Sequence, residues 1–154
     1  MIKISIIIPT FNPSNLIYKC LLSVLNQSIN KKYYEIILVD DNSKNNFYKK
    51  YKKIIKNNIT YIKNKSNKGP GISRNIGIAK STGSHILFLD SDDFLKKNSL
   101  KKIFLSLNKK KVDVIFYNYC IQYKKSKKFF KTKNKYINNK IKNINLFLTA
   151  SIDT

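Results

Sequence analysis

Short apolar runs alternate with amphipathic segments along most of this chain, and this alternation constrains the fold more than any other feature. Apolar runs at 4–8, 35–39, 59–62 and 85–89 have the length of buried strands. The segments between them repeat apolar residues at helical spacing. Strands that alternate with helices form βαβ units, in which parallel strands carry helices on both faces. We therefore predict an α/β fold with a mostly parallel, Rossmann-like sheet.

Residues that commonly end strands or cap helices give the expected boundaries of these elements. Pro9 is expected to end the first strand, and Ser14 to cap a helix after it. A loop over 64–71 is expected before a small-residue helix marked by Ile72, Ile76 and Ala79. A further helix opens at 98 or 99, and 112–121 is expected to form a fifth strand. Residues 122–142 are dense in lysine and asparagine, which predicts a hairpin or a poorly ordered tail.

The formal net charge of +23 would ordinarily favour a nucleic-acid or anionic-membrane partner. The lysines, however, are spread through nearly every segment and accompany an excess of asparagine and isoleucine, which is typical of a coding bias. We therefore expect solvated lysines, with peripheral contact to an anionic membrane as an open alternative and no nucleic-acid partner.

The chain has no run of about 18 uncharged apolar residues and no signal-peptide pattern at its N-terminus. This predicts a cytoplasmic protein, at most peripheral on the inner face of the cell membrane. Cys20 and Cys120 lack the close spacing of a metal or redox pair, so buried thiols are expected.

The rare residues gather where the predicted strands end. Of eight acidic residues, five lie in two clusters, Asp40-Asp41 after one strand and Asp90, Asp92 and Asp93 after another. In an open parallel sheet, ligands bind beyond the carboxyl ends of the strands. One crevice is therefore expected to hold both clusters.

Three carboxylates within four residues repel one another unless a counter-charge is present. Hard oxygen ligands select Mg²⁺ or Mn²⁺, which are often held by one or two carboxylates and substrate phosphates. A metal bridging a nucleotide diphosphate is one interpretation of Asp90-Ser91-Asp92, and a solvated acidic turn that caps the next helix is the other.

Two further residues have both a functional and a structural interpretation. Arg74, the only arginine, follows a glycine turn and could grip a diphosphate with its planar fork, or it could be a surface residue. Asp41 could accept the imide N–H of uracil, and either Asp40 or Asp41 could be a turn or N-cap residue. His85 is expected to be a packed or edge residue rather than a base.

Four segments resemble the motifs of the family 2 glycosyltransferases, which have the GT-A fold. They are SIIIPTFN at 5–12, LVDDNS at 38–43, NKGPG at 67–71 with RNIG at 74–77, and LDSDD at 89–93. Each motif alone is of modest specificity, but the four occur in order and at the usual spacing over residues 2 to about 120.

The resemblance implies a set of site residues. Residues 9–12 would line the base and ribose, Asp41 would contact the base, and Arg74 and Asn75 would lie near the ribose and diphosphate. The donor-binding residues expected on this basis are Pro9, Thr10, Phe11, Asn12, Asp40, Asp41, Arg74, Asn75, Asp90 and Ser91. Asp90 and Asp92 would form the Asp-x-Asp signature that holds Mn²⁺ or Mg²⁺, with Asp92 as the direct ligand.

The resemblance also implies transfer of a sugar from a nucleotide-diphosphate donor, expected to be a UDP-sugar, to a glycan or lipid-linked acceptor. Residues 1–121 would form the nucleotide-sugar domain, and 122–154 the lysine-rich, incomplete start of an acceptor region. Inverting members take their general base from a later carboxylate, and after Asp113 the only acid is Asp153.

We therefore expect donor binding with little transfer by this chain alone, and no catalytic residue is assigned. Two alternatives stay open: a non-catalytic nucleotide-sugar-binding remnant, and a basic module that binds membrane surfaces.

Overall fold

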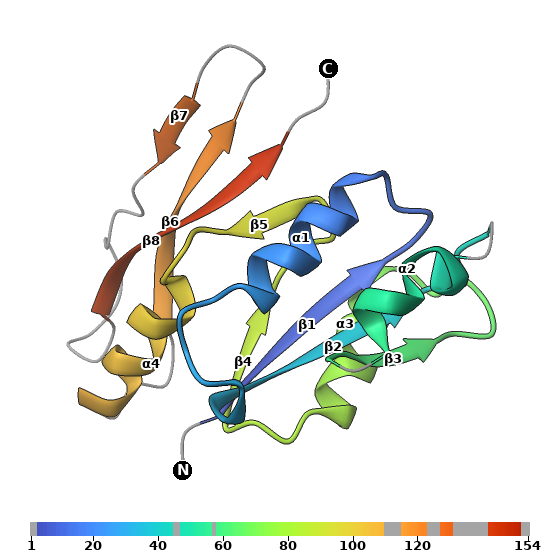
Figure 1. Cartoon of the computed structure of the whole chain (residues 1–154), viewed down its shortest axis with the longest axis horizontal. Coiled ribbons are helices and arrows are strands. Elements are labelled where there is room, and N and C mark those ends of the chain that lie inside the picture. The colour runs from blue at the N-terminus through green and yellow to red at the C-terminus, as the bar shows by residue number, and fades with distance from the viewer. Residues whose placement is uncertain are drawn as a thin grey trace.

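The computed structural model describes residues 3–44, 47–56, 58–109, 115–122, 127–130 and 142–151, with two four-stranded sheets (Figure 1). The first sheet has the order β3-β2-β1-β4 and contains β1 (Ile4–Thr10), β2 (Tyr34–Asp40), β3 (Thr60–Lys63) and β4 (His85–Phe88). All of its strands are parallel. The second sheet has the order β5-β8-β6-β7 and contains β5 (Asp93–Leu95), β6 (Ile115–Gln122), β7 (Lys127–Phe130) and β8 (Lys142–Ser151).

Helices cover both faces of the parallel sheet, so the predicted α/β class is confirmed. They are α1 (Leu16–Leu25), α2 (Phe47–Ile55), α3 (Pro70–Lys80) and α4 (Ser99–Lys109), with a short 3-10 turn, η1 (Lys31–Tyr33). Buried residues of α1, α2 and α4 pack with Ile4, Ile6 and Ile8 on one face. Ile7 faces the opposite side with Ile37, Val39 and part of α3. The continuous apolar run of β1 is thus buried on both faces, as its pattern predicts.

The first strand does not end at Pro9 but continues to Thr10. The carbonyl of Ile7 accepts the N–H of Leu89 on the β4 side, whereas the carbonyl of Thr10 accepts the N–H of Asp41 on the β2 side. Successive residues of a strand direct their backbone groups to opposite neighbours, so the nitrogen of Pro9 faces the β4 side. The last β4 pair lies at Ile7, and proline is tolerated because no neighbour needs its missing N–H.

Helix α3 differs from its prediction in its start, and of the isoleucines that mark it Ile76 packs against the sheet. It begins at Pro70 rather than after Gly71, and Gly69 precedes it with φ of 86°, a conformation that favours glycine. Its buried residues are Ser73 and Gly77, whereas Ile72 is exposed. A β-carbon on Gly77 would lie 2.4 Å from Cγ2 of Ile7, so the helix packs this closely on β1 only because position 77 lacks a side chain.

The C-terminal half contains strands that the sequence pattern does not predict. β5 lies within the segment expected to be an acidic loop, and β8 pairs antiparallel with β5 and parallel with β6. β7 pairs antiparallel with β6, which fits the hairpin alternative for 127–130. Residues 112–114 of the expected fifth strand lie outside the described residues. Because β8 belongs to 122–154 and β6 largely to 1–121, the two expected regions share a sheet.

Within the described part of the chain, every helix is too short or too polar to span a bilayer. Cys20 is buried and free, as expected, and the side chain of Cys120 lies outside the described residues. His85 lies on β4, at an edge of the parallel sheet, which confirms its expected placement.

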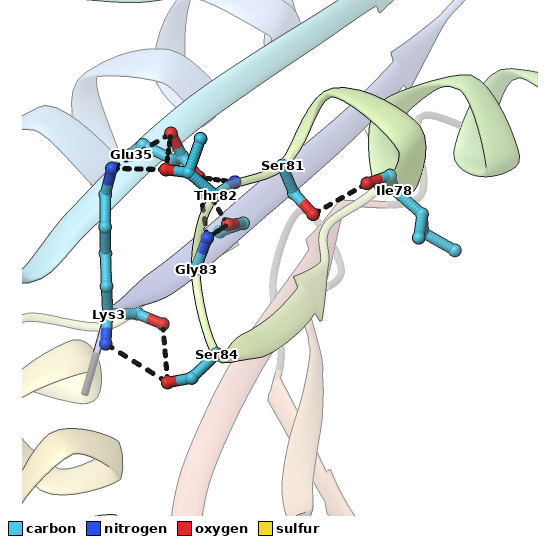
Figure 2. Close-up of polar contacts among 8 residues, drawn as sticks. Lys3, Glu35, Ile78, Ser81, Thr82, Gly83 and Ser84 are labelled. Atoms are coloured by element: carbon cyan, nitrogen blue, oxygen red, sulfur yellow. Dashed lines mark hydrogen bonds and ion pairs between the residues drawn. The ribbon is translucent and has the colours of Figure 1, made fainter. Parts of the chain in front are cut away.

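Glu35 fixes the turn between α3 and β4 at the end of the sheet where β1 begins (Figure 2). Its carboxylate accepts hydrogen bonds from the Ser5 hydroxyl at 2.6 Å, the Thr82 N–H at 2.6 Å and the Gly83 N–H at 3.1 Å. The ammonium group of Lys3 lies 3.1 Å from the same carboxylate. One side chain of β2 therefore holds β1 and the turn together.

Burial alone would raise the pKa of Glu35, but hydrogen bonds from Ser5, from the backbone of Thr82, from Lys3 and from the Thr82 hydroxyl lower it to about 2. Since this pKa is below its ordinary value of 4.5, the ionised carboxylate stabilises the folded state fully above about pH 4.5. That contribution is lost as the pH falls from about 4.5 towards 2.

Replacing Glu35 with glutamine should lower the free energy of unfolding at neutral pH by about 1–2 kcal/mol, because charge-assisted hydrogen bonds are lost. The difference between wild type and Glu35→Gln should shrink as the pH falls below about 4.5. Urea denaturation at several pH values measures both effects. Lys102→Gln, which removes a charge at an exposed position of α4, is the control and should leave neutral-pH stability nearly unchanged. If the difference in free energy of unfolding between wild type and Glu35→Gln stayed the same from about pH 6 to about pH 3, the assignment would be contradicted.

Candidate functional site

A cavity of about 340 Å³ opens at the carboxyl end of the parallel sheet, between the ends of β1 and β2, the start of α3 and the turn after β4. Its lining residues are Pro9, Thr10, Phe11, Asp41, Asn67, Gly69, Pro70, Ser73, Arg74, Asp90, Ser91 and Asp92. Both acidic clusters and the only arginine therefore contribute to one cavity, as the strand-end argument predicts.

The end of β1 supplies one wall. Thr10 is only 4% exposed, and its hydroxyl oxygen has no hydrogen-bond partner in the described part of the chain. Buried hydroxyl groups are normally paired, so this one is available to a ligand in the cavity. Phe11 is 47% exposed and presents an apolar ring at the rim.

Asp40 and Asp41 have separate roles because adjacent strand-end residues point to opposite faces. Asp40 is fully buried and accepts hydrogen bonds from the Tyr61 hydroxyl at 2.5 Å and from the Ser43 N–H at 2.8 Å. It does not line the cavity, so the expectation of a donor contact at Asp40 is not met by its placement. Asp40 instead ties β2 to β3 and to the loop before α2.

Asp41 lines the cavity and organises the loop before α3. Its carboxylate accepts from Nδ2 of Asn64 at 2.7 Å, from the N–H of Lys68 at 3.0 Å and from the N–H of Gly69 at 2.7 Å. Burial would raise the pKa of Asp41, but these bonds and one from Ser73 lower it. The aspartate is therefore held ionised, and its oxygens are already well supplied with donors.

Arg74 and Asp90 form an ion pair across the cavity, with 2.6 Å between Nη2 of Arg74 and Oδ1 of Asp90. The guanidinium also lies over the ring of Phe88, at 5.9 Å from its centre. Both side chains stay partly exposed, so neither charge is sequestered from a ligand. The pair joins the first turns of α3 to the acidic turn after β4.

The acidic turn is compact. The N–H of Asp93 donates to the carbonyl of Asp90 at 3.0 Å, and the thiol of Cys20 on α1 lies 3.5 Å from that same carbonyl. Burial, followed by the charges of Asp92 and Asp90, raises the pKa of Asp93 to about 6. Burial and the charges of Asp93, Asp92 and Asp90 also raise the pKa of the Cys20 thiol.

The donor set fits a divalent metal that is shared with a substrate. Among the described residues, no group of three or more histidine, cysteine, aspartate or glutamate side chains could hold a metal ion by itself. Three aspartates line the cavity, and because Asp41 is occupied by the loop before α3, Asp90 and Asp92 are the two that could hold a metal. Mg²⁺ is commonly held by one or two carboxylates together with substrate phosphates, rather than by a cage made only of protein ligands. Asp90 and Asp92 would therefore be enough to hold a Mg²⁺ ion that a substrate phosphate also binds.

Most of the expected site residues meet in this cavity, but three do not. Asn12 links two loops instead, because its N–H donates to Ser43 Oγ at 2.9 Å and its side chain accepts from the Lys44 N–H at 2.8 Å. Asn75 is exposed on α3 and, like Asp40, does not line the cavity.

Sequence reasoning did not assign Asn67, Gly69, Pro70 and Ser73 to the site. The first three lie in the glycine-containing segment that carries part of the family resemblance, and this was the available signal. Ser73 had no such signal, because only the packing of α3 on β1 shows that a small polar residue must face inward there.

The chain is similar to several curated and solved glycosyltransferases. It is 42% identical over 101 residues to a poly(ribitol-phosphate) beta-glucosyltransferase of Bacillus spizizenii, covering 64% of this chain and 16% of that protein. It is 33% identical over 128 residues to the poly(ribitol-phosphate) beta-N-acetylglucosaminyltransferase TarP of Staphylococcus aureus, covering 79% of this chain and 38% of TarP. The chain thus spans well under half the length of these relatives.

Solved structures of a glycosyltransferase, S. aureus TarS, also resemble the fold of this chain. The crystal structure of residues 1–349 of S. aureus TarS in complex with UDP matches with a TM-score of 0.72 at 29% identity, over 81% of this chain and 38% of that one. The TarS structure in complex with UDP-GlcNAc matches equally well, with a TM-score of 0.72. The model of the family described as "Glycosyl transferase family 2" matches residues 5–154. With four motifs, a GT-A arrangement and this match in agreement, the chain belongs to glycosyl transferase family 2.

Proposed function

We propose that this chain binds a UDP-sugar with a divalent metal and supplies the donor site for sugar transfer to a glycan, lipid-linked or phosphate-containing polymer acceptor. The observation that carries the proposal is the single cavity bordered by Thr10, Asp41, Arg74, Asp90 and Asp92. Family membership supports nucleotide-sugar transfer, and the named acceptor of the similar proteins, poly(ribitol-phosphate), supports the acceptor class.

The two ends of the cavity suit the two ends of a nucleotide diphosphate. At the β1 end, the ring of Phe11 and the unpaired hydroxyl of Thr10 suit a planar base and a ribose. At the other end, Arg74 lies in the first turns of α3, where backbone N–H groups also favour an anion. UDP and UDP-GlcNAc complexes of TarS support a uridine donor.

The ion pair between Arg74 and Asp90 would be replaced when the donor binds. Arg74 would turn its planar fork to the diphosphate, which carries more charge than one carboxylate. Asp90 and Asp92 would hold Mn²⁺ or Mg²⁺, whose chemistry is to stabilise the charge that builds on the departing diphosphate. Arg74 would stabilise the same developing charge from the helix side.

The remaining expectations are proposals as well. We place the protein in the cytoplasm with solvated lysines, and keep peripheral contact with the inner membrane face as the alternative. Residues 1–121 would bind the nucleotide sugar, and 122–154 would begin the acceptor region. A test for sugar transfer or donor hydrolysis separates an enzyme from a remnant that only binds.

Asp92→Ala should abolish the effect of Mn²⁺ on UDP binding, because one of two candidate metal carboxylates is lost. Isothermal titration calorimetry with UDP should show binding at least about tenfold tighter with Mn²⁺ than without it in the wild type. The variant should show one weak affinity under both conditions. Asn108→Ala, on an exposed residue of α4 outside the cavity, is the control and should behave like the wild type. Wild-type binding that is indifferent to the metal would rule out the metal-dependent proposal.

Arg74→Lys keeps the positive charge but loses the planar fork, so UDP affinity should fall about tenfold. Uridine, which has no phosphate, should bind both proteins equally well. Competition titration with UDP and uridine measures the two affinities. Equal losses for both ligands would show that Arg74 shapes the cavity rather than gripping the diphosphate.

Asp41→Asn tests how this residue acts on the donor. Because its carboxylate already accepts three groups from the loop, we expect UDP and CDP affinity to fall by the same factor, together with a loss of stability of about 1–3 kcal/mol. Direct contact with uracil instead predicts a selective loss for UDP. Thermal unfolding and titration of both nucleotides distinguish these two outcomes.

A further inference from the structure

The guanidinium of Arg74 has an aromatic partner as well as an ion-pair partner. Its central carbon lies 5.9 Å from the centre of the Phe88 ring, and its Nη2 lies 2.6 Å from Oδ1 of Asp90. A cation within about 6 Å of a ring centre is attracted by the negative face of the ring. Phe88 does not line the cavity of the candidate site, so an effect of this ring on a ligand there must act through another side chain.

Both partners of Arg74 come from one firmly held strand end. Phe88 is the last residue of β4 and pairs with Ile7, whose side chain packs on the α3 side of the sheet. Paired residues of neighbouring strands lie on the same face, so the ring of Phe88 lies in the layer of α3. Leu89 follows, is 1% exposed, and donates its N–H to the carbonyl of Ile7 at 3.1 Å. The same backbone therefore places the ring and the carboxylate of Asp90.

The two partners would behave differently when charged ligands bind. In the proposed function, Asp90 holds the metal and so leaves Arg74. The ring of Phe88 carries no charge that a metal or a phosphate could capture. It also offers no oxygen acceptor, so the N–H donors of the guanidinium stay available to the diphosphate. Without the ring, Arg74 would regain the freedom of a long side chain when it has to meet the diphosphate, and ordering it again would oppose binding.

Ile86 provides a matched comparison for Phe88. The two residues lie two positions apart on β4 and so share one face of this edge strand. Phe88 is 39% exposed and Ile86 is 38% exposed. Ile86, however, has neither a ring nor a charge to offer to Arg74. If both were exposed only because nothing in the described part of the chain covers them, their replacement should have similar effects.

We propose that Phe88 is a positioning residue for the diphosphate of the donor: its ring keeps the guanidinium of Arg74 at the cavity after Asp90 has turned to the metal. This inference rests on the proposed function, because that function assigns the diphosphate to Arg74. It adds a residue that lies outside the cavity and just before the LDSDD segment at 89–93.

The first test needs no ligand. Arg74 is the only arginine, so its Nε–H gives a single side-chain signal of this type in a proton–nitrogen NMR spectrum. The ring current of Phe88 should displace that signal in the wild type. Phe88→Leu should remove the displacement, and Phe88→Tyr, which keeps a ring, should retain it. In an Asp90→Asn background, Phe88→Leu should move the signal by a similar amount, because the ring holds Arg74 without the ion pair. Ile86→Ala is the control and should leave the signal in place.

The second test measures the consequence for the donor by calorimetry with Mn²⁺ present. Phe88→Leu should weaken UDP binding about three- to fivefold, as expected for the loss of one partly exposed contact between a cation and a ring. Uridine, which has no phosphate, should bind the variant and the wild type within about 1.5-fold of each other. Phe88→Tyr and Ile86→Ala should both keep the UDP affinity of the wild type. In an Arg74→Ala background, Phe88→Leu should cause no further loss.

An Arg74 signal that Phe88→Leu does not move, or that Ile86→Ala moves equally far, overturns the proposal. Equal losses of UDP and uridine binding also overturn it, because the ring would then support the cavity as a whole. A loss of UDP affinity that persists in the Arg74→Ala background overturns it as well. Failure of the wild type to bind UDP would contradict the proposed function, whereas the NMR signal tests the hold of the ring on Arg74 without any ligand. The two failures are therefore distinguishable.

Discussion

The parallel pairing of β1 with β2 on one side and β4 on the other is the constraint on which the site depends. It brings the three strand ends to one edge, so that residues more than 80 positions apart, such as Pro9 and Asp90, line one cavity. The pairing requires β1 to be apolar on both faces and α3 to approach it closely. Gly77 permits that approach, since any β-carbon there would overlap Ile7.

Three carboxylates hold loops in place by accepting hydrogen bonds from backbone N–H groups. Asp40 ties β2 to Tyr61 and to the loop before α2, and Asp41 ties β2 to the loop before α3. Glu35 does the same at the other end of the sheet, for the turn that leads into β4. In a chain with only eight acidic residues, three are thus used to fix loop geometry. The shape of the cavity depends on these bonds as much as on the residues that face it.

The sequence predicts the parallel sheet, its helices and the clustering of the rare residues well, because each leaves a periodic or compositional signal. It does not separate Asp40 from Asp41, since only the pleat of β2 decides which of two adjacent carboxylates faces the cavity. It also misses β5, because three residues are too few to show a period, and β8, whose pairing with β5 and β6 is long-range. The inward placement of Ser73 and Gly77 beside Ile76 on α3 is hidden for a similar reason, because it depends on the close packing of the helix on β1.

The contact between Arg74 and Asp90 has a consequence for the order in which charges enter the cavity. An anion that bound Arg74 without a cation would leave the carboxylate of Asp90 without its partner, next to Asp92 and Asp93. A cation that bound Asp90 without an anion would leave the guanidinium of Arg74 without its partner. Binding of either ion alone would therefore be less favourable than binding of both. For the proposed ligands, this contact would favour joint binding of the anion and the metal, and thermodynamic linkage would then require each ligand to strengthen the binding of the other.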